Sequence, residues 1–190
     1  MSPIVSNATP LIYLAKVRRL DLLRKAFGEV LIPEEVKIEV VDRGKALGET
    51  DAFAVEKALD DGWLRVLRAE PLETPIRLQA GEASARSLAR KLAVREVLVD
   101  EVSARTAARL LGLTPRGTVF VLLKALELKE LNLDGFLELL NQLIRHGFRL
   151  REEVYVEAVR KAREIVDPPT LEDPQPGQAR SERTRAIPLL

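Results

Sequence analysis

Two adjacent carboxylates, Asp100 and Glu101, stand where the sequence changes from strand-like to helix-like. Apolar residues of high strand propensity precede them at 97–99, and a helical pattern follows from about 103 to 111 and ends at Gly112. In open α/β sheets, ligands bind at the carboxyl ends of the strands. We therefore take Asp100 as the centre of a candidate site. The alternative is that both acids only complement the dipole of the following helix.

The composition limits which chemistry is available to this site. The chain has 190 residues, of which 46% are hydrophobic, and this suits one domain with a substantial core. Cysteine is absent, so disulfides, thiolate metal sites and a cysteine nucleophile are excluded, and His146 is the only histidine. A metal site must therefore be built from oxygen ligands, which suit Mg²⁺ or Mn²⁺.

The charge pattern limits the partners. The formal net charge is +1, so contact with nucleic acid requires a local basic cluster. No apolar run approaches the roughly 20 residues of a membrane span, and no signal peptide is visible, so we expect no membrane partner and a cytoplasmic protein. A charged fraction of 31% without cysteine is typical of thermophilic proteins.

Short strand patterns alternate with helix patterns along the chain. This alternation predicts an α/β fold with a mostly parallel sheet that is covered on both faces. We expect the domain to span residues 1–166 and residues 167–190 to form a flexible, proline-rich, basic tail. The expected strands are 4–6, 29–32, 63–67 and 97–99, and residues 43–49 are expected to form a loop. The expected helices follow Thr9 and Pro33 and then cover 51–60, 80–93, 103–111, 118–129, 134–145, with Asp134 as its cap, and 152–166.

Three further polar residues fall where they would meet Asp100 in such a fold. Asn7 ends the first strand, and Glu39 and Glu82 lie early in helices that would lean over the same edge of the sheet. Carboxylates brought together repel unless a cation joins them, and a bound Mg²⁺ can clamp a phosphodiester and acidify water. The set predicts metal-dependent phosphodiester hydrolysis. As alternatives, Glu82 would pair with Arg86 on its own helix, and Asn7 would bond a turn.

Several cationic and hydroxyl side chains surround these positions. Arg105 and Arg109 share a helix face suited to phosphate, and Arg116 lies in an expected turn at 115–118, although a solvated face or ion pairing is equally plausible for all three. Thr9 and Thr118 are expected first as helix caps. Glu101 by itself is expected as an exposed acid in the first helical turn.

The order and spacing of these short motifs resemble those of PIN-domain proteins, in the single-domain prokaryotic branch close to VapC-type toxins. The resemblance covers about residues 1–160. No single motif in it is specific. The segments that carry it are 5–12, 32–39, 81–83, 98–101, 104–105, 117–118 and 147–150.

The resemblance implies a three-layer α/β/α fold, Mg²⁺ or Mn²⁺ as cofactor, and cleavage of single-stranded RNA by the toxin of a toxin–antitoxin pair, with an antitoxin protein as a further partner. Glu101 would be an additional ligand, Thr9 would orient the ligand on the first strand, and Arg105 would hold Asp100 or contact phosphate. The implied acidic site consists of Asn7, Glu39, Glu82 and Asp100.

One departure from the family pattern keeps two hypotheses open. Asn7 stands where the family usually has Asp, and its amide offers an oxygen but no charge. Weaker metal binding would leave either a metal-dependent ribonuclease or a PIN-like module that binds nucleic acid or protein without cutting. The scarcity of basic surface also favours a homodimer with a shared groove. A phosphate-accepting regulator domain would use strand-end acids too, but no lysine ends a later strand.

Overall fold

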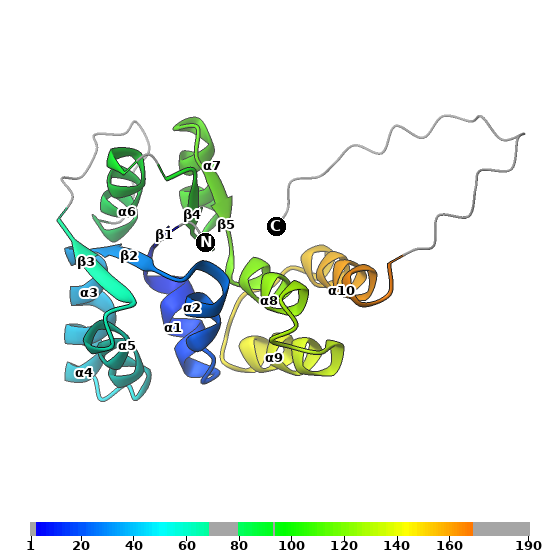
Figure 1. The fold of residues 1–190 in the computed structure, drawn as a ribbon. Coiled ribbons are helices and arrows are strands. Elements are labelled where there is room, and N and C mark those ends of the chain that lie inside the picture. Colours follow the sequence, from blue (N-terminus) through cyan, green and yellow to red (C-terminus); the bar gives the residue numbers. More distant parts are fainter. Residues whose placement is uncertain (1–2, 69–79, 93, 169–190) are drawn as a thin grey trace, which may run out of the picture.

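The fold is built on a parallel sheet. The computed structural model describes residues 3–68, 80–92 and 94–168, with the backbone alone for residues 80–82. Within these residues, five strands form one sheet in the order β3-β2-β1-β4-β5, and all neighbouring pairs are parallel, as predicted (Figure 1). The strands are β1 (Ile4–Ser6), β2 (Val30–Pro33), β3 (Leu64–Leu67), β4 (Glu96–Leu98) and β5 (Thr114–Arg116).

The register of the central strands brings their carboxyl ends to one level. Ser6 of β1 pairs with Leu98 of β4, and the next amide along, that of Asn7, donates to the carbonyl of Leu98 at 3.0 Å. On the other side of β4, the amide of Val99 donates to the carbonyl of Arg116 at 2.8 Å. The residues that follow β1, β4 and β5 therefore meet at one edge of the sheet, as the sequence predicted for Asn7 and Asp100.

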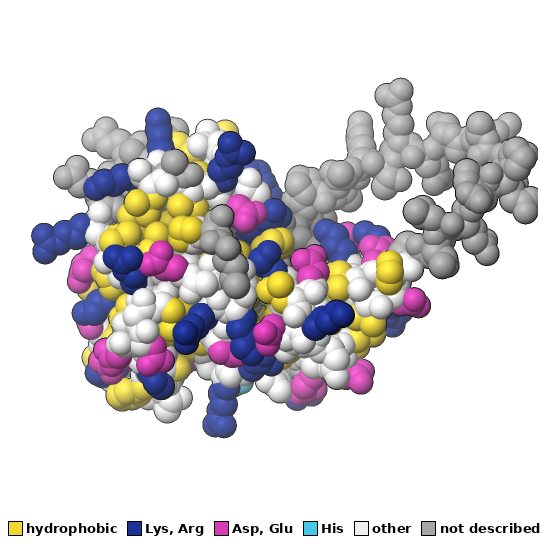
Figure 2. All heavy atoms as spheres, in the orientation of Figure 1, with side chains coloured by type: hydrophobic (Ala, Val, Ile, Leu, Met, Phe, Trp, Pro, Cys, Tyr) yellow, Lys and Arg dark blue, Asp and Glu magenta, His cyan; other side chains and the backbone are white. Residues whose placement is uncertain are grey.

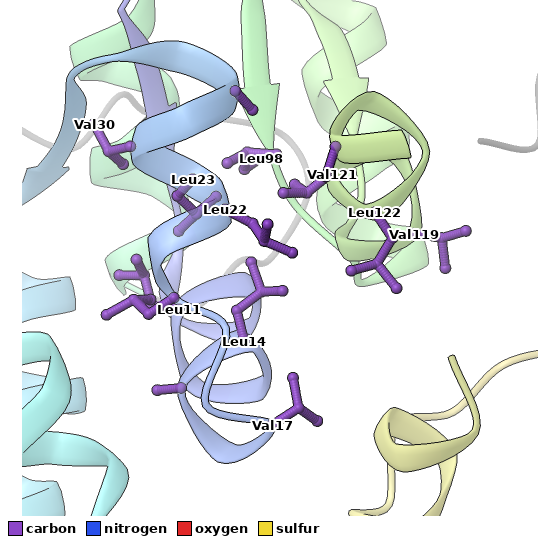
Figure 3. Packing of buried hydrophobic residues seen from close by; sticks show 14 of the residues in the cluster. Leu11, Leu14, Val17, Leu22, Leu23, Val30, Leu98, Val119, Val121 and Leu122 are labelled. Carbon is purple, nitrogen blue, oxygen red and sulfur yellow. The ribbon is translucent and has the colours of Figure 1, made fainter. Parts of the chain in front are cut away.

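Successive strand residues face two separate apolar cores, because side chains alternate across a sheet. Val5, Leu31 and Val97 pack against α6 (Ala80–Lys91) and α7 (Val102–Leu110). Ile4, Val30 and Leu98 belong to the larger core. Figure 3 shows Val30 and Leu98 close to buried leucine and valine side chains of the surrounding helices. The main helices of the larger core are α1 (Ala8–Lys16), α2 (Asp21–Phe27), α5 (Asp51–Asp60), α8 (Thr118–Glu127), α9 (Leu133–Arg145) and α10 (Glu152–Val166). The predicted three-layer α/β/α fold is confirmed.

A π-helical segment interrupts the helical stretch after β2. The segment η1 (Ile38–Arg43) lies between the short helices α3 (Glu34–Lys37) and α4 (Gly44–Ala46). The prediction of a loop from residue 43 was therefore wrong for its first residues. Single-turn π segments inside helices are rare and frequently occur at functional sites. This one carries Glu39.

Three other local expectations were wrong. Residues 114–116 form the edge strand β5 rather than a turn, and an edge strand tolerates Pro115 because one side of it needs no hydrogen-bond donor. Helix α1 begins at Ala8, one residue before the expected cap Thr9. Helix α9 is capped by Asn132 rather than Asp134, since the Asn132 side chain accepts a hydrogen bond from the amide of Gly135 at 2.8 Å.

The surface carries charges of both signs. On the face drawn in Figure 2, lysine and arginine side chains are interspersed with aspartate and glutamate, in keeping with the small net charge. Among the described helices, none has the length and apolar character needed to cross a bilayer. The expected tail at 167–190 falls almost entirely outside the described residues.

Replacing one buried leucine tests the larger core. Leu122 on α8 is fully buried, whereas Leu110 at the end of α7 is 70% exposed. We expect Leu122→Ala to lower the free energy of unfolding by about 2–5 kcal/mol, because it removes packed methyl groups and leaves a cavity. The matched control Leu110→Ala should change it by less than about 0.5 kcal/mol. Urea denaturation measures both, and equal effects would contradict the assigned core.

Candidate functional site

The side chain of Asp100 is fixed by the start of α8. One carboxylate oxygen accepts the main-chain amide of Thr118 at 2.8 Å, and the other accepts the Thr118 hydroxyl at 2.7 Å. Thr118 is fully buried and is the first residue of α8, with Gly117 as the N-cap. The expected capping role of Thr118 was therefore wrong, because its hydroxyl bonds to Asp100 instead. The positive end of the helix dipole adds to the attraction for this carboxylate.

Gly117 belongs to the site, although a glycine has no side-chain chemistry by which the sequence analysis could select it. A Cβ at this position would lie 2.8 Å from Oδ1 of Asp100 and 3.2 Å from Nη1 of Arg105. Only glycine lets the end of β5 come this close to the carboxylate. The one available signal was the Gly-Thr pair before an apolar helix.

Glu101 takes a more central place than its expected role as an exposed first-turn acid. It is half-buried and is the N-cap residue of α7. Its carboxylate accepts a hydrogen bond from Nδ2 of Asn7 at 3.0 Å and another from the hydroxyl of Thr9. The side chains of Asn7 and Thr9 therefore donate hydrogen bonds that join the segment after β1 to the segment after β4. The structure brings Asn7, Thr9 and Glu101 together.

Asn7 also carries an oxygen that lacks a partner. The residue is only 3% exposed, and its Oδ1 has no hydrogen-bond partner within the described part of the chain. Leaving a buried acceptor unpaired costs about 1–3 kcal/mol. Such atoms are usually paired in native proteins, so an unpaired one calls for an explanation, such as an ion. An amide oxygen is a suitable ligand for Mg²⁺ or Mn²⁺.

The surroundings of Asp100 and Glu39 disfavour the charged forms of these two carboxylates. Burial raises the pKa of Asp100 to about 6, and the hydrogen bonds from Thr118 oppose the shift only in part. The pKa of Glu39 is raised too, first by burial and then by the negative charge of Glu101, which places these two carboxylates near each other. A cation would relieve both penalties.

Positive charge gathers on the opposite side of Asp100. Nη1 of Arg105 donates to the carbonyl of Val99 at 3.3 Å. Burial lowers the pKa of the Arg105 guanidinium, and so do the nearby charges of Arg109 and Arg116. Arg116 itself forms an ion pair with Glu96 at 2.7 Å. It also lies 4.3 Å from the centre of the Phe120 ring, so its guanidinium is already engaged within the protein.

The described residues fit an ion by their chemistry, without forming a complete cage. Among them, no three acidic or histidine side chains lie close enough to hold a metal. Glu82 is the third residue of α6, which packs against β1, β2 and α3, but its side chain lies outside the described residues. Its role as a ligand stays a prediction. His146 is exposed and is the C-cap residue of α9.

The pKa of Asp100 predicts how stability depends on pH. The folded pKa of about 6 lies above the ordinary 3.8, so the folded state binds more protons and loses stability as the pH rises from about 4 to 6. At about 1.4 kcal/mol per pKa unit, this amounts to about 3 kcal/mol. We therefore expect the free energy of unfolding of Asp100→Asn, relative to that of wild type at the same pH, to rise by about this much from pH 4 to pH 7 in EDTA. Urea denaturation at each pH measures it. A difference that does not vary with pH would contradict the assignment.

Substituting Gly117 tests the close approach. In Gly117→Ala, the added methyl group must displace the Asp100 carboxylate, because its Cβ would lie only 2.8 Å from Oδ1 of Asp100. The displacement weakens the two hydrogen bonds from Thr118 that hold this carboxylate. We expect Mn²⁺ affinity to fall about tenfold or more, as for other changes that disturb the orientation of a ligand. Isothermal titration calorimetry measures this, and unchanged affinity would show that Asp100 does not need this geometry.

Comparison with known proteins agrees with this architecture. A family model described as a PIN domain matches residues 3–164. No curated protein and no solved structure gave a match. PIN domains are generally nucleases, typically bind nucleic acid and generally use divalent metal ions. Because the match extends over most of its length, the chain belongs to the PIN-domain family.

Proposed function

We propose that this protein is a metal-dependent endoribonuclease that hydrolyses single-stranded RNA. The observation that carries the proposal is the buried, unpaired Oδ1 of Asn7, at the edge of the sheet where Asp100 and Glu101 also lie. An acceptor oxygen beside several carboxylates favours a hard cation over an internal hydrogen bond. Membership of a family that generally consists of nucleases supplies the reaction class.

The proposed ligands are Asp100, Glu39, Glu82, Asn7 and Glu101. A bound Mg²⁺ or Mn²⁺ would stabilise negative charge on the phosphodiester and make water more acidic. The hydrogen bonds from Thr118 fix the orientation of Asp100, and the hydroxyl of Thr9 fixes that of Glu101.

Arg105 has a separate part in this proposal. Its guanidinium lies on the other side of Asp100, close to Gly117, where it would attract a phosphate group to the acidic edge. Arg109, the next cation along the helix, adds to the same field. We therefore propose both as contacts to the RNA backbone, with Arg116 holding the local structure through Glu96 and Phe120.

Cleavage of a mixed single-stranded RNA pool tests the proposal. Wild-type protein should cut with Mn²⁺ or Mg²⁺ but not in EDTA, and Asp100→Asn should lower the rate at least about 100-fold, since even indirect partners of a metal ligand cost about 10–100-fold. The matched control Asp60→Asn changes an exposed acid at the end of α5 and should leave the rate unchanged. Metal-dependent cutting that survives in Asp100→Asn would contradict the assigned site.

Asn7 favours a second candidate, a PIN-like module that binds RNA or protein without cutting. Its Nδ2 donates to Glu101, an interaction that the usual Asp could not make, so the acidic edge is held together without an ion. If wild-type protein binds no Mn²⁺ at millimolar concentration and Asn7→Asp restores both metal binding and cleavage, the module is the correct assignment.

We also propose, from the resemblance to VapC-type proteins, that the nuclease is the toxin of a toxin–antitoxin pair. The expected partners are then an antitoxin protein and, by the argument from sparse basic surface, a second copy of the chain. Growth arrest on expression, abolished by Asp100→Asn, is the expected outcome. Sedimentation of the purified protein would establish whether it dimerises.

A further inference from the structure

A pocket of about 300 Å³ has Asp100 in its lining, whereas neither Asn7 nor Glu39 lines it. Asp100 and Gly117 form one wall of it, so the pocket opens onto the candidate catalytic edge. Its volume is at the lower end of the roughly 300–1,000 Å³ of small-molecule sites. The pocket is therefore large enough for one small organic group and too small for a folded peptide.

The lining has a strong excess of positive charge. Arg105 and Arg109 come from α7, and Arg149 and Arg151 come from the segment between α9 and α10. Of the described residues in the lining, Asp100 alone is acidic. Among the described residues, neither Arg149 nor Arg151 forms an ion pair, and both are exposed. Nη2 of Arg105 is buried and lacks a hydrogen-bond partner within the same described part.

The rest of the lining is apolar and partly aromatic. Val102, Phe120, Phe148 and Leu150 are among its members, and Val102 is 73% exposed. Arginine forks suit phosphate oxygens because they donate two parallel hydrogen bonds. Flat apolar and aromatic surfaces suit an unstacked base. A nucleotide presents both groups at once, whereas an acidic peptide offers charge without a base.

We propose that this pocket binds one unpaired nucleotide of the RNA strand, adjacent to the phosphodiester that is cut. Its phosphate contacts Arg149 and Arg151, and its base lies against Val102 and Phe120. The inference rests on the proposed function for the identity of the strand, but it assigns the recognition of that strand to residues outside the acidic site. Only an unpaired, unstacked base offers a free face to these apolar and aromatic side chains, which gives a physical reason for single-stranded substrates.

Binding of a fluorescein-labelled, mixed-sequence ten-nucleotide RNA in EDTA tests this without any cleavage. We expect Arg149→Gln and Arg151→Gln each to weaken binding about tenfold, as for one charge-assisted hydrogen bond. Each change should also reduce the slope of log Kd against log salt concentration by about 0.7, the contribution of one phosphate contact on a single strand. Arg65→Gln is the matched control, because Arg65 is an exposed arginine on β3, at the opposite edge of the sheet.

Three results would overturn the proposal. The first is wild-type affinity in both pocket variants, and the second is equal affinity for the same sequence as a duplex. The third is displacement of the labelled RNA by polyglutamate as effectively as by unlabelled RNA, because the arginines would then recognise negative charge alone. Melting curves check that the variants are folded. Cleavage with Mn²⁺ separates the two proposals. Binding that depends on Arg149 and Arg151, without cleavage, would support the nucleotide pocket and contradict the nuclease function. Cleavage without such binding would support the nuclease function and contradict the pocket.

Discussion

The pair of hydrogen bonds from Thr118 to Asp100 is the constraint on which the rest of the site depends. It ties the end of β4 to the first residue of α8, and it requires glycine at the preceding position. The bonds and the helix dipole favour the charged carboxylate, yet the pKa of Asp100 is still raised because burial outweighs them. The fold thus holds a carboxylate in a fixed direction at a cost to its own stability, as is common at functional sites.

Asp100 also divides the edge of the sheet into two electrostatic halves. Toward β1 and β2 lie Glu101 and Glu39, and the charge of Glu101 adds to burial in raising the pKa of Glu39. Toward β5 lie Arg105 and its neighbouring cations, whose charges add to burial in lowering the pKa of Arg105. Each half is unfavourable alone, and a phosphate bound together with a cation would satisfy both. A chain with a net charge of only +1 can therefore attract nucleic acid through local arrangement rather than through total charge.

The parts of this picture that were predictable from the sequence depend on local patterns. The strand before Asp100 and helix 51–60 follow from hydrophobic periodicity, and the meeting of Asn7 with Asp100 follows from the rule for parallel strands. Glu101 was misjudged and Gly117 was missed as a site residue, because their places depend on contacts between segments 18 to 94 residues apart in the sequence. Arg149 and Arg151 were missed as well, whereas Arg105 and Arg109 were predicted from their shared helix face. The strand β5 was missed because its proline suggests a turn when its position at the edge of the sheet is unknown.

The direction of the Glu39 side chain depends on the number of residues in the π-helical segment η1 as well as on their identity. A π-helical turn holds one more residue than an α-helical turn, so loss of a single residue from this segment would restore a continuous α-helix. Residues beyond the deletion would rotate by roughly 100° about the helix axis relative to those before it. One codon deleted or inserted here would thus change the direction of Glu39 relative to Val40 and Val41, the two residues by which this segment packs into the larger core. Activity in this fold could be lost or regained in evolution through an indel, without any substitution at the acidic residues.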